Sequence, residues 1–319
     1  MRVHGEKVAA GGTHGTEAPQ ALADVKPGIA EFVAGYSIET TPRDVIAGAL
    51  PLRLLARETD VYIAHPPAAT LHDVVKAAAM VQGAGYNAVP HLLARGILGA
   101  DQLEDTLRRL QQAGVSRILV IAGDAADPNR AFDSTLEIFY TGMLERYGFG
   151  HIGFAGHPEG NRSVGPSLLK QALLDKLAYA AQSPSRFYLL TQFGFDASAV
   201  IAYEQYVRSL GYDIPVHVGM AGLAGLKQLL LYAARCGVRS SLGLLMDRSD
   251  IIRGVATSAP DRLIRQFAEY RLAERRCLFA RAHFFAFGSF ELTVSWANSV
   301  AASDFELAGD TGFDIPARP

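Results

Sequence analysis

The chain has 319 residues, of which 49% are hydrophobic and 19% are charged, and its formal net charge is −2. This composition supports a large buried core and excludes a disordered chain. The small net charge gives no basic field for nucleic acid or an anionic membrane, so neither is expected as a partner. No apolar run reaches the roughly 18 residues of a membrane span. Residues 1–20 lack the apolar core of a signal peptide, which predicts a cytoplasmic protein.

Strand patterns alternate with helical patterns along almost the whole chain. After a flexible leader over residues 1–27, strands are predicted over 35–39, 60–65, 86–93, 115–121, 149–155, 187–193, 214–218 and 281–287. Helices are predicted over 42–56, 70–82, 101–113, from 166, and over 197–210, 223–234, 261–278 and 291–301. Eight such units predict a single-domain α/β fold, a closed (β/α)8 TIM barrel over 28–303, followed by an unstructured tail over 304–319.

Two carboxylates at predicted strand ends are the first candidates for chemistry, because barrel enzymes place their active sites there. Glu39 follows Ile38 inside a strand pattern, where an unpaired charge is costly. Asp124 follows Gly123, and a glycine lets a ligand approach the backbone closely. Both are predicted to serve as acid, base or fixed charge. Asp196, in contrast, precedes a helical pattern and is predicted to be an N-cap.

Other catalytic classes find little support in the sequence. His65, His91 and His157 follow three different strands and could converge on a metal, but no HxH or HxxE spacing accompanies them, so no metal is predicted. No GxSxG nucleophile turn and no GxGxxG loop after the first strand is present. Cys236 and Cys277 lie far apart without zinc or redox spacing, and both are predicted to be reduced thiols.

Several short blocks occur in an order and spacing typical of one enzyme family. They are Ser37-Ile38-Glu39, Pro90-His91-Leu92, Gly123-Asp124, His157-Pro158-Glu159 and Leu190-Thr191-Gln192-Phe193-Gly194-Phe195-Asp196. With these blocks the chain resembles the methylenetetrahydrofolate reductases over about residues 30–300. That family comprises flavin-dependent barrel enzymes of one-carbon metabolism and methionine biosynthesis. The resemblance implies reduction of 5,10-methylenetetrahydrofolate to 5-methyltetrahydrofolate, or the reverse oxidation, with NADH or NADPH and bound FAD.

The resemblance also implies roles for individual residues. Glu39 matches the general acid at folate N10, and Asp124 matches the aspartate that stabilises the cationic iminium beside the pterin. Gln192 matches a folate-binding glutamine, and Leu226 stands where a phenylalanine clamps the substrates. The implied FAD-binding positions are His91, Ala122, Gly123, Asp124, Ser134, His157, Glu159 and Lys176.

The chain departs from the family pattern mainly where a flavin diphosphate would lie. Ala122 replaces an arginine, His157 replaces a tyrosine, and Lys176 alone remains of a basic cluster. Diphosphates are bound by arginine, lysine or helix N-termini, so weak FAD binding is predicted. Three alternatives therefore stay open: a flavin-free folate-dependent reductase, a methyl-transfer barrel, and a catalytically weak folate-binding subunit that needs a partner protein. The nucleotide preference, the direction and a homo-oligomeric state also remain open.

Overall fold

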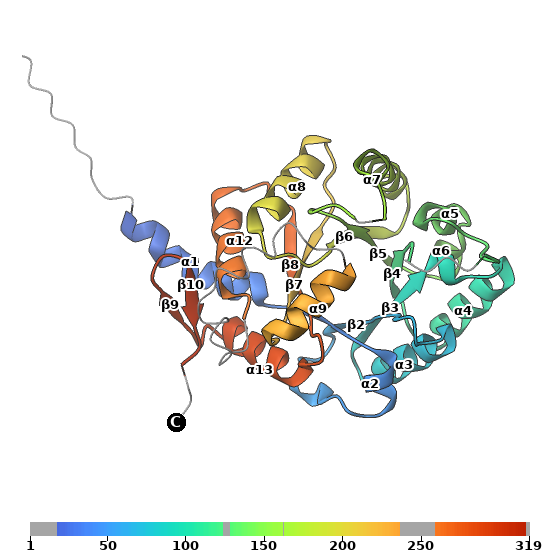
Figure 1. Ribbon diagram of the computed structural model, residues 1–319, viewed down its shortest axis with the longest axis horizontal. Coiled ribbons are helices and arrows are strands. Elements are labelled where there is room, and N and C mark those ends of the chain that lie inside the picture. The colour runs from blue at the N-terminus through green and yellow to red at the C-terminus, as the bar shows by residue number, and fades with distance from the viewer. Residues whose placement is uncertain (1–17, 124–127, 162, 237–258, 317–319) are drawn as a thin grey trace, which may run out of the picture.

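The computed structural model describes residues 18–123, 128–161, 163–236 and 259–316. Eight parallel strands close into a barrel in chain order, from β1 to β8, and helices surround the barrel (Figure 1). The predicted (β/α)8 TIM barrel is therefore confirmed. None of the helices in these ranges combines the length and the apolar character that crossing a bilayer requires.

The barrel strands are β1 (Ser37–Thr40), β2 (Asp60–Ile63), β3 (Asn87–Leu93), β4 (Arg117–Ile121), β5 (His151–Gly156), β6 (Arg186–Thr191), β7 (Val216–Ala221) and β8 (Phe279–Phe285). The helices are α1 (Ala18–Val33), α2 (Pro42–Ile46), α3 (Leu71–Gly83), α4 (Ala100–Gln112), α5 (Thr135–Tyr140), α6 (Met143–Arg146), α7 (Pro166–Ala180), α8 (Ala197–Ser209), α9 (Leu226–Cys236), α12 (Asp261–Ala273) and α13 (Phe290–Ala301). Short 3-10 turns, η1 (Leu52–Leu54) and η2 (Ala94–Gly96), follow α2 and β3.

Local sequence signals explain where several helices begin. At α3, the Thr70 hydroxyl accepts a hydrogen bond from the Asp73 amide at 3.1 Å, and the Asp73 carboxylate accepts one from the Thr70 amide at 2.9 Å. This reciprocal capping box satisfies two amides that would otherwise lack partners. At α8, the Asp196 carboxylate accepts from the Ser198 amide at 2.9 Å, as the predicted N-cap should.

The barrel strands are buried on both of their faces. The outward side chains of Ile38, Val61 and Ile118 are fully buried against the surrounding helices. The inward side chains of Tyr62, Leu119 and other residues fill the barrel itself. Side chains alternate along a strand, so one register fixes which residues face the interior.

The two ends of the described chain are more ordered than the sequence predicted. Helix α1 begins at Ala18 and contains Pro27, within the region predicted to be a flexible leader over 1–27. The region predicted as an unstructured tail over 304–319 instead forms a hairpin of β9 (Glu306–Ala308) and β10 (Gly312–Asp314). The Phe313 ring is buried and stacks on Trp296 of α13 at 5.7 Å, which anchors the hairpin.

Candidate active site

Three polar atoms converge at the C-terminal mouth of the barrel. The Glu39 carboxylate oxygen Oε2 lies 3.3 Å from His91 Nε2 and 3.9 Å from His283 Nε2. The three side chains come from β1, β3 and β8, and the Glu39 side chain is 17% exposed. Within the described residues, none of the three atoms has a partner in hydrogen-bond geometry. Buried polar atoms normally have partners, so this arrangement is costly and marks a candidate functional site.

The burial of this cluster sets its protonation. Burial raises the pKa of Glu39, and the nearby His91 only partly opposes that rise. Burial lowers the pKa of His91, and it lowers the pKa of His283 to about 3. A carboxyl with a raised pKa beside two neutral imidazoles keeps its proton at higher pH than an ordinary glutamate. Such a group can donate a proton to a ligand in the mouth.

Residues deeper in the barrel hold the His283 ring in place. The ring nitrogen Nδ1 is 2.9 Å from the Ser37 hydroxyl, in hydrogen-bond contact. The Tyr62 ring packs edge-on against His283, with ring centroids 4.5 Å apart. These two contacts leave the Nε2 edge of His283 directed at Glu39. Sequence analysis predicted Glu39 and His91, which the structure brings together, but it missed His283 and Tyr62. His283 could have been found from the sequence, because side chains alternate along the predicted eighth strand and His283 falls among its inward-facing positions.

Polar groups also close the floor of the barrel. The Tyr62 hydroxyl donates to the Tyr188 hydroxyl at 2.8 Å, and Tyr62 is the register partner of Glu39 on the neighbouring strand. Nearer the N-terminal end, the Asp60 carboxylate accepts from Arg281 at 2.6 Å and from Arg117 at 3.4 Å. The interior is thus packed with side chains, as in other TIM barrels, and is not a pore. A ligand can therefore approach Glu39 only from the C-terminal mouth.

The end of β4 is built around a glycine turn. Gly123 has a φ of +84°, a conformation that costs glycine little and other residues more. Arg95, in η2, donates to the carbonyl oxygen of Gly123 at 2.9 Å and to that of Asp133 at 3.0 Å. Asp124 itself lies outside the described residues, as does the side chain of Leu226 at the start of α9. Their sequence-based assignments stay predictions.

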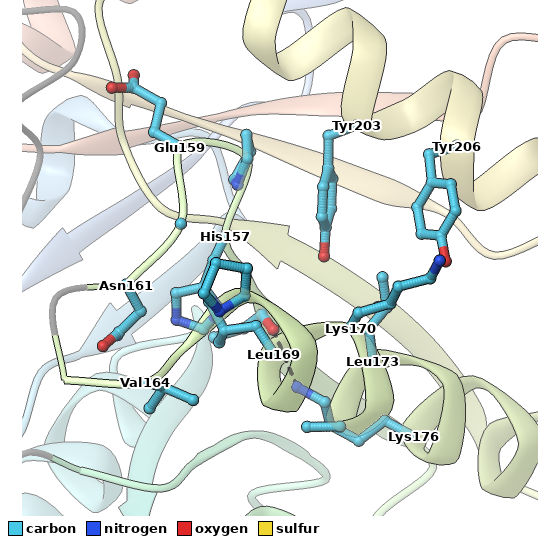
Figure 2. Close-up of a pocket in the computed structure, with 15 residues that line it drawn as sticks. His157, Glu159, Asn161, Val164, Leu169, Lys170, Leu173, Lys176, Tyr203 and Tyr206 are labelled. Atoms are coloured by element: carbon cyan, nitrogen blue, oxygen red, sulfur yellow. Dashed lines mark hydrogen bonds between the residues drawn. The ribbon is translucent and has the colours of Figure 1, made fainter.

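A cavity of ≈ 500 Å³ lies beside the loop that follows β5, between α7 and α8. Figure 2 shows Tyr203 and Tyr206 of α8 facing Leu169 and Leu173 of α7 across it. Val164 in the loop adds to this mostly apolar wall. The cavity is the place where three of the predicted flavin-binding residues meet, namely His157, Glu159 and Lys176.

The Lys176 side chain is hydrogen-bonded to the protein's own main chain. Its ammonium group donates to the Ala155 carbonyl oxygen at 3.2 Å and lies 5.0 Å from the centroid of the Phe154 ring. Burial lowers the pKa of Lys176 to about 8, so its positive charge is weakly held near neutral pH. Lys170 is the other cation among the described lining residues, and its ammonium lies over the Tyr206 ring at the exposed rim.

Ser134, His157 and Glu159 offer a flavin diphosphate no positive charge. The Ser134 hydroxyl caps α5 by accepting from the Glu137 amide at 3.3 Å. Burial lowers the pKa of His157 to about 4, so its imidazole is neutral. The Glu159 carboxylate points away from the cavity in Figure 2. Helix α7 begins with Pro166, which has no N–H, so one donor of its first turn is missing. The described residues therefore do not fit a flavin diphosphate, which needs several free cationic or N–H donors.

No group of three or more histidine, cysteine, aspartate or glutamate side chains in the described ranges is placed to hold a metal ion. Cys277 is half-buried and forms no disulfide, and burial raises the pKa of its thiol to about 11. An un-ionised thiol is a poor nucleophile. Among the described residues at the mouth, the Glu39 carboxyl and the imidazoles of His91 and His283 are groups that can exchange protons with a ligand.

Comparison with known proteins identifies the family and supports the barrel fold. The sequence pattern of the family described as methylenetetrahydrofolate reductase matches residues 64–253, more than half of the chain. A similar solved structure is an uncharacterized protein from Clostridium thermocellum that binds two copies of 5-methyl-5,6,7,8-tetrahydrofolic acid. The TM-score is 0.57 at 12% identity, covering 85% of this chain and 98% of that chain, which supports the fold alone. The family match over residues 64–253 shows that this chain belongs to the methylenetetrahydrofolate reductase family.

Proposed function

We propose that the chain interconverts 5,10-methylenetetrahydrofolate and 5-methyltetrahydrofolate, with NAD(P)H as the source of the hydride. The observation that carries this proposal is the buried Glu39 carboxyl between two neutral imidazoles at the mouth of the barrel. Burial raises the pKa of that carboxyl, as a proton donor at neutral pH requires. Family membership supplies the substrate class, because Glu39 resembles the family's general acid.

The proposed reaction begins with a proton transfer from Glu39. The proton goes to folate N10, the bond between N10 and the methylene carbon breaks, and its electron pair stays on N10. The product is an iminium cation at N5, which accepts a hydride from C4 of the nicotinamide and becomes the methyl group. Asp124 is proposed as the fixed anion that stabilises the iminium. Gln192, half-buried at the end of β6, is proposed to bind the folate.

The flavin is the least supported part of the family chemistry in this chain. Lys176 is bound to the Ala155 carbonyl, and Ala122 offers no charge where the resemblance places an arginine. These features favour the flavin-free reductase over an enzyme with tightly bound FAD. The proposed proton and hydride steps accordingly involve only the folate, the nucleotide and the residues at the mouth.

The proposal is tested by incubating the purified protein with 5,10-methylenetetrahydrofolate and either NADH or NADPH, with and without added FAD. Oxidation of the nucleotide is followed at 340 nm, and 5-methyltetrahydrofolate is measured by chromatography. Formation of one methyl product for each nucleotide oxidised is the expected result. Tight binding of 5-methyltetrahydrofolate without turnover under any of these conditions would instead identify a binding subunit. Absence of both binding and turnover would reject a folate function.

A further inference from the structure

Aromatic side chains form a continuous surface from the end of β6 to the end of β8. The Phe287 ring stacks on Tyr232 of α9, with centroids 4.1 Å apart and planes at 17°. It also lies nearly parallel to Phe285, at 5.9 Å and 16°, and edge-on to Phe193 at 4.9 Å. We name these four residues the aromatic wall. Phe285, Phe287 and Tyr232 are only partly buried, so the described residues do not entirely enclose the wall.

The backbone at Phe287 is held in an unusual conformation. Phe287 has a φ of +46°, in the left-handed region that bulky residues rarely adopt. The Gln228 side-chain amide donates to the Phe287 carbonyl oxygen and fixes the turn. Strained residues of this kind concentrate at ligand sites, where the surrounding structure maintains them. A glycine would adopt this backbone without strain but would remove a ring from the wall.

The aromatic wall begins directly beside the proposed acid. The Phe285 ring contacts the edge of His283, with centroids 4.7 Å apart, and His283 Nε2 is 3.9 Å from Glu39 Oε2. Gly219 on β7 makes this contact feasible, because a Cβ there would lie 2.7 Å from the Phe285 ring and 2.2 Å from the carbonyl oxygen of Thr191. The wall therefore extends from the acid toward the exposed end of β8.

We propose that the aromatic wall binds the p-aminobenzoyl ring of the folate and that Phe287 is the residue that stacks on this ring. The inference rests on the proposed function, because the nitrogen that Glu39 would protonate, N10, is bonded directly to the benzoyl ring. When N10 of a folate lies at Glu39, the benzoyl ring bonded to N10 lies next to the aromatic wall. Offset stacking of aromatic rings supplies affinity beyond simple burial.

The test compares three ligands on the full-length protein by calorimetry or ligand-observed NMR. They are 5-methyltetrahydrofolate, 6-methyltetrahydropterin, which lacks the benzoyl ring, and p-aminobenzoylglutamate, which lacks the pterin. Phe287→Leu keeps an apolar side chain on the same strained backbone but removes the ring. It should weaken binding of the two benzoyl ligands about tenfold and leave the pterin within twofold of wild type. Phe287→Tyr should restore binding.

Two further variants separate a ligand contact from lost stability. Phe313→Leu breaks a stacked aromatic pair in the C-terminal hairpin, away from the mouth, and should leave all three affinities unchanged. Tyr232→Leu removes the other ring of the stack, and provides a second measurement if Phe287→Leu fails to fold. Thermal unfolding of every variant is recorded alongside the binding.

The outcomes distinguish this inference from the proposed function. If wild type binds 5-methyltetrahydrofolate and Phe287→Leu binds it equally well, the ring contact is wrong and the function stands. Equal weakening of the pterin and the benzoyl ligands would also overturn the assignment to the benzoyl ring. If wild type fails to bind 5-methyltetrahydrofolate yet binds p-aminobenzoylglutamate through Phe287, the wall stands and the folate function falls. Binding of none of the ligands rejects both.

Discussion

The two sides of the barrel mouth differ in what their buried polar groups contact. On the acid side, Glu39, His91 and His283 face one another, and their converging atoms lack hydrogen-bond partners within the described residues. On the side of α7 and α8, the buried ammonium of Lys176 donates to a main-chain carbonyl and lies over an aromatic ring. The atoms of the acid side therefore have unused hydrogen-bonding capacity, whereas the Lys176 ammonium is already bonded to the protein's own main chain.

This difference separates two parts of the proposed chemistry, the proton transfer and the binding of a flavin. The acid side requires only that a carboxyl stay protonated, and burial by neighbouring strands achieves that without any cofactor. A flavin diphosphate requires several donors in one place, and substitution of one or two of them weakens the whole site. We therefore expect the folate chemistry to depend strongly on Glu39 and only weakly on the α7–α8 cavity.

The largest effect is expected from Glu39→Gln. The amide preserves the shape of the side chain but cannot deliver the proton, so folate turnover should fall by about 10²–10⁴-fold. Affinity for 5-methyltetrahydrofolate should stay within a few-fold of wild type, because the variant keeps the fold and the proposed stacking of the benzoyl ring on Phe287. Rates are compared in single-turnover experiments, with Glu31→Gln as the matched control on the exposed face of α1.

The role of Glu39 as the acid also predicts how the folate rate should change with pH. The proposed reaction needs the protonated carboxyl, and burial raises the pKa of Glu39. The folate rate should therefore be highest at low pH and decline as pH rises through that raised pKa, while Glu39→Gln shows no such decline. If the variant retains a rate within a few-fold of wild type, or the same decline persists in it, then another group is the acid.

A smaller effect is expected for the flavin. Because few donors in the described cavity are available to a diphosphate, the purified protein should show little absorbance near 450 nm. Dialysis against high salt should remove whatever flavin is bound, since salt screens the ionic contacts that remain. Adding FAD to the dialysed protein is the control for a site that was merely emptied. Stoichiometric flavin after dialysis would show that residues outside the described ranges complete the site.

The sequence predicted the barrel and two of the three residues of the acid cluster for different physical reasons. Strand and helix periodicities are local, so eight β/α units could be recognised from residue order alone. Glu39 was found because a charge inside an apolar strand pattern is costly. His283 was missed because its importance comes from the closure of β8 against β1, which places residues 246 positions apart, Ser37 and His283, in contact. The C-terminal hairpin was missed because its short strands are stabilised by packing of Phe313 on Trp296.

The surroundings of Lys176 in the α7–α8 cavity were the least predictable part of the site. Lys176 occupies the position that the resemblance assigns to a phosphate contact, and its residue type agrees with that role. In the folded protein, however, its ammonium is directed at the Ala155 carbonyl. The direction of a long side chain depends on its tertiary surroundings, in this case a buried aromatic ring and a strand-end carbonyl. The role of a side chain is therefore predicted less reliably from its residue type and position than a buried strand is predicted from its sequence pattern.

The smallest effect should come from Lys176→Met, which replaces the ammonium with an apolar group of similar length. Nucleotide and FAD affinities should change by less than about twofold, because an ammonium already bound to Ala155 contributes little to a ligand. The difference in stability between wild type and Lys176→Met should change with pH in a defined direction. The folded pKa of Lys176 is about 8 and the ordinary value is 10.5, so the unfolded chain binds more protons between these values. Wild-type stability should therefore rise across this window relative to Lys176→Met.

Thermal unfolding of both proteins from pH 7 to pH 10.5 measures that trend. Lys176→Met should be at least as stable as wild type at pH 7, because it avoids the desolvation of a buried charge, and its advantage should shrink as pH rises. Lys170→Met serves as the matched control, since that side chain lies at the exposed rim of the same cavity. A loss of ligand affinity specific to Lys176→Met would mean that the ammonium turns toward a bound phosphate. In that case the two sides of the mouth would both be ligand sites, and the contrast between them would disappear.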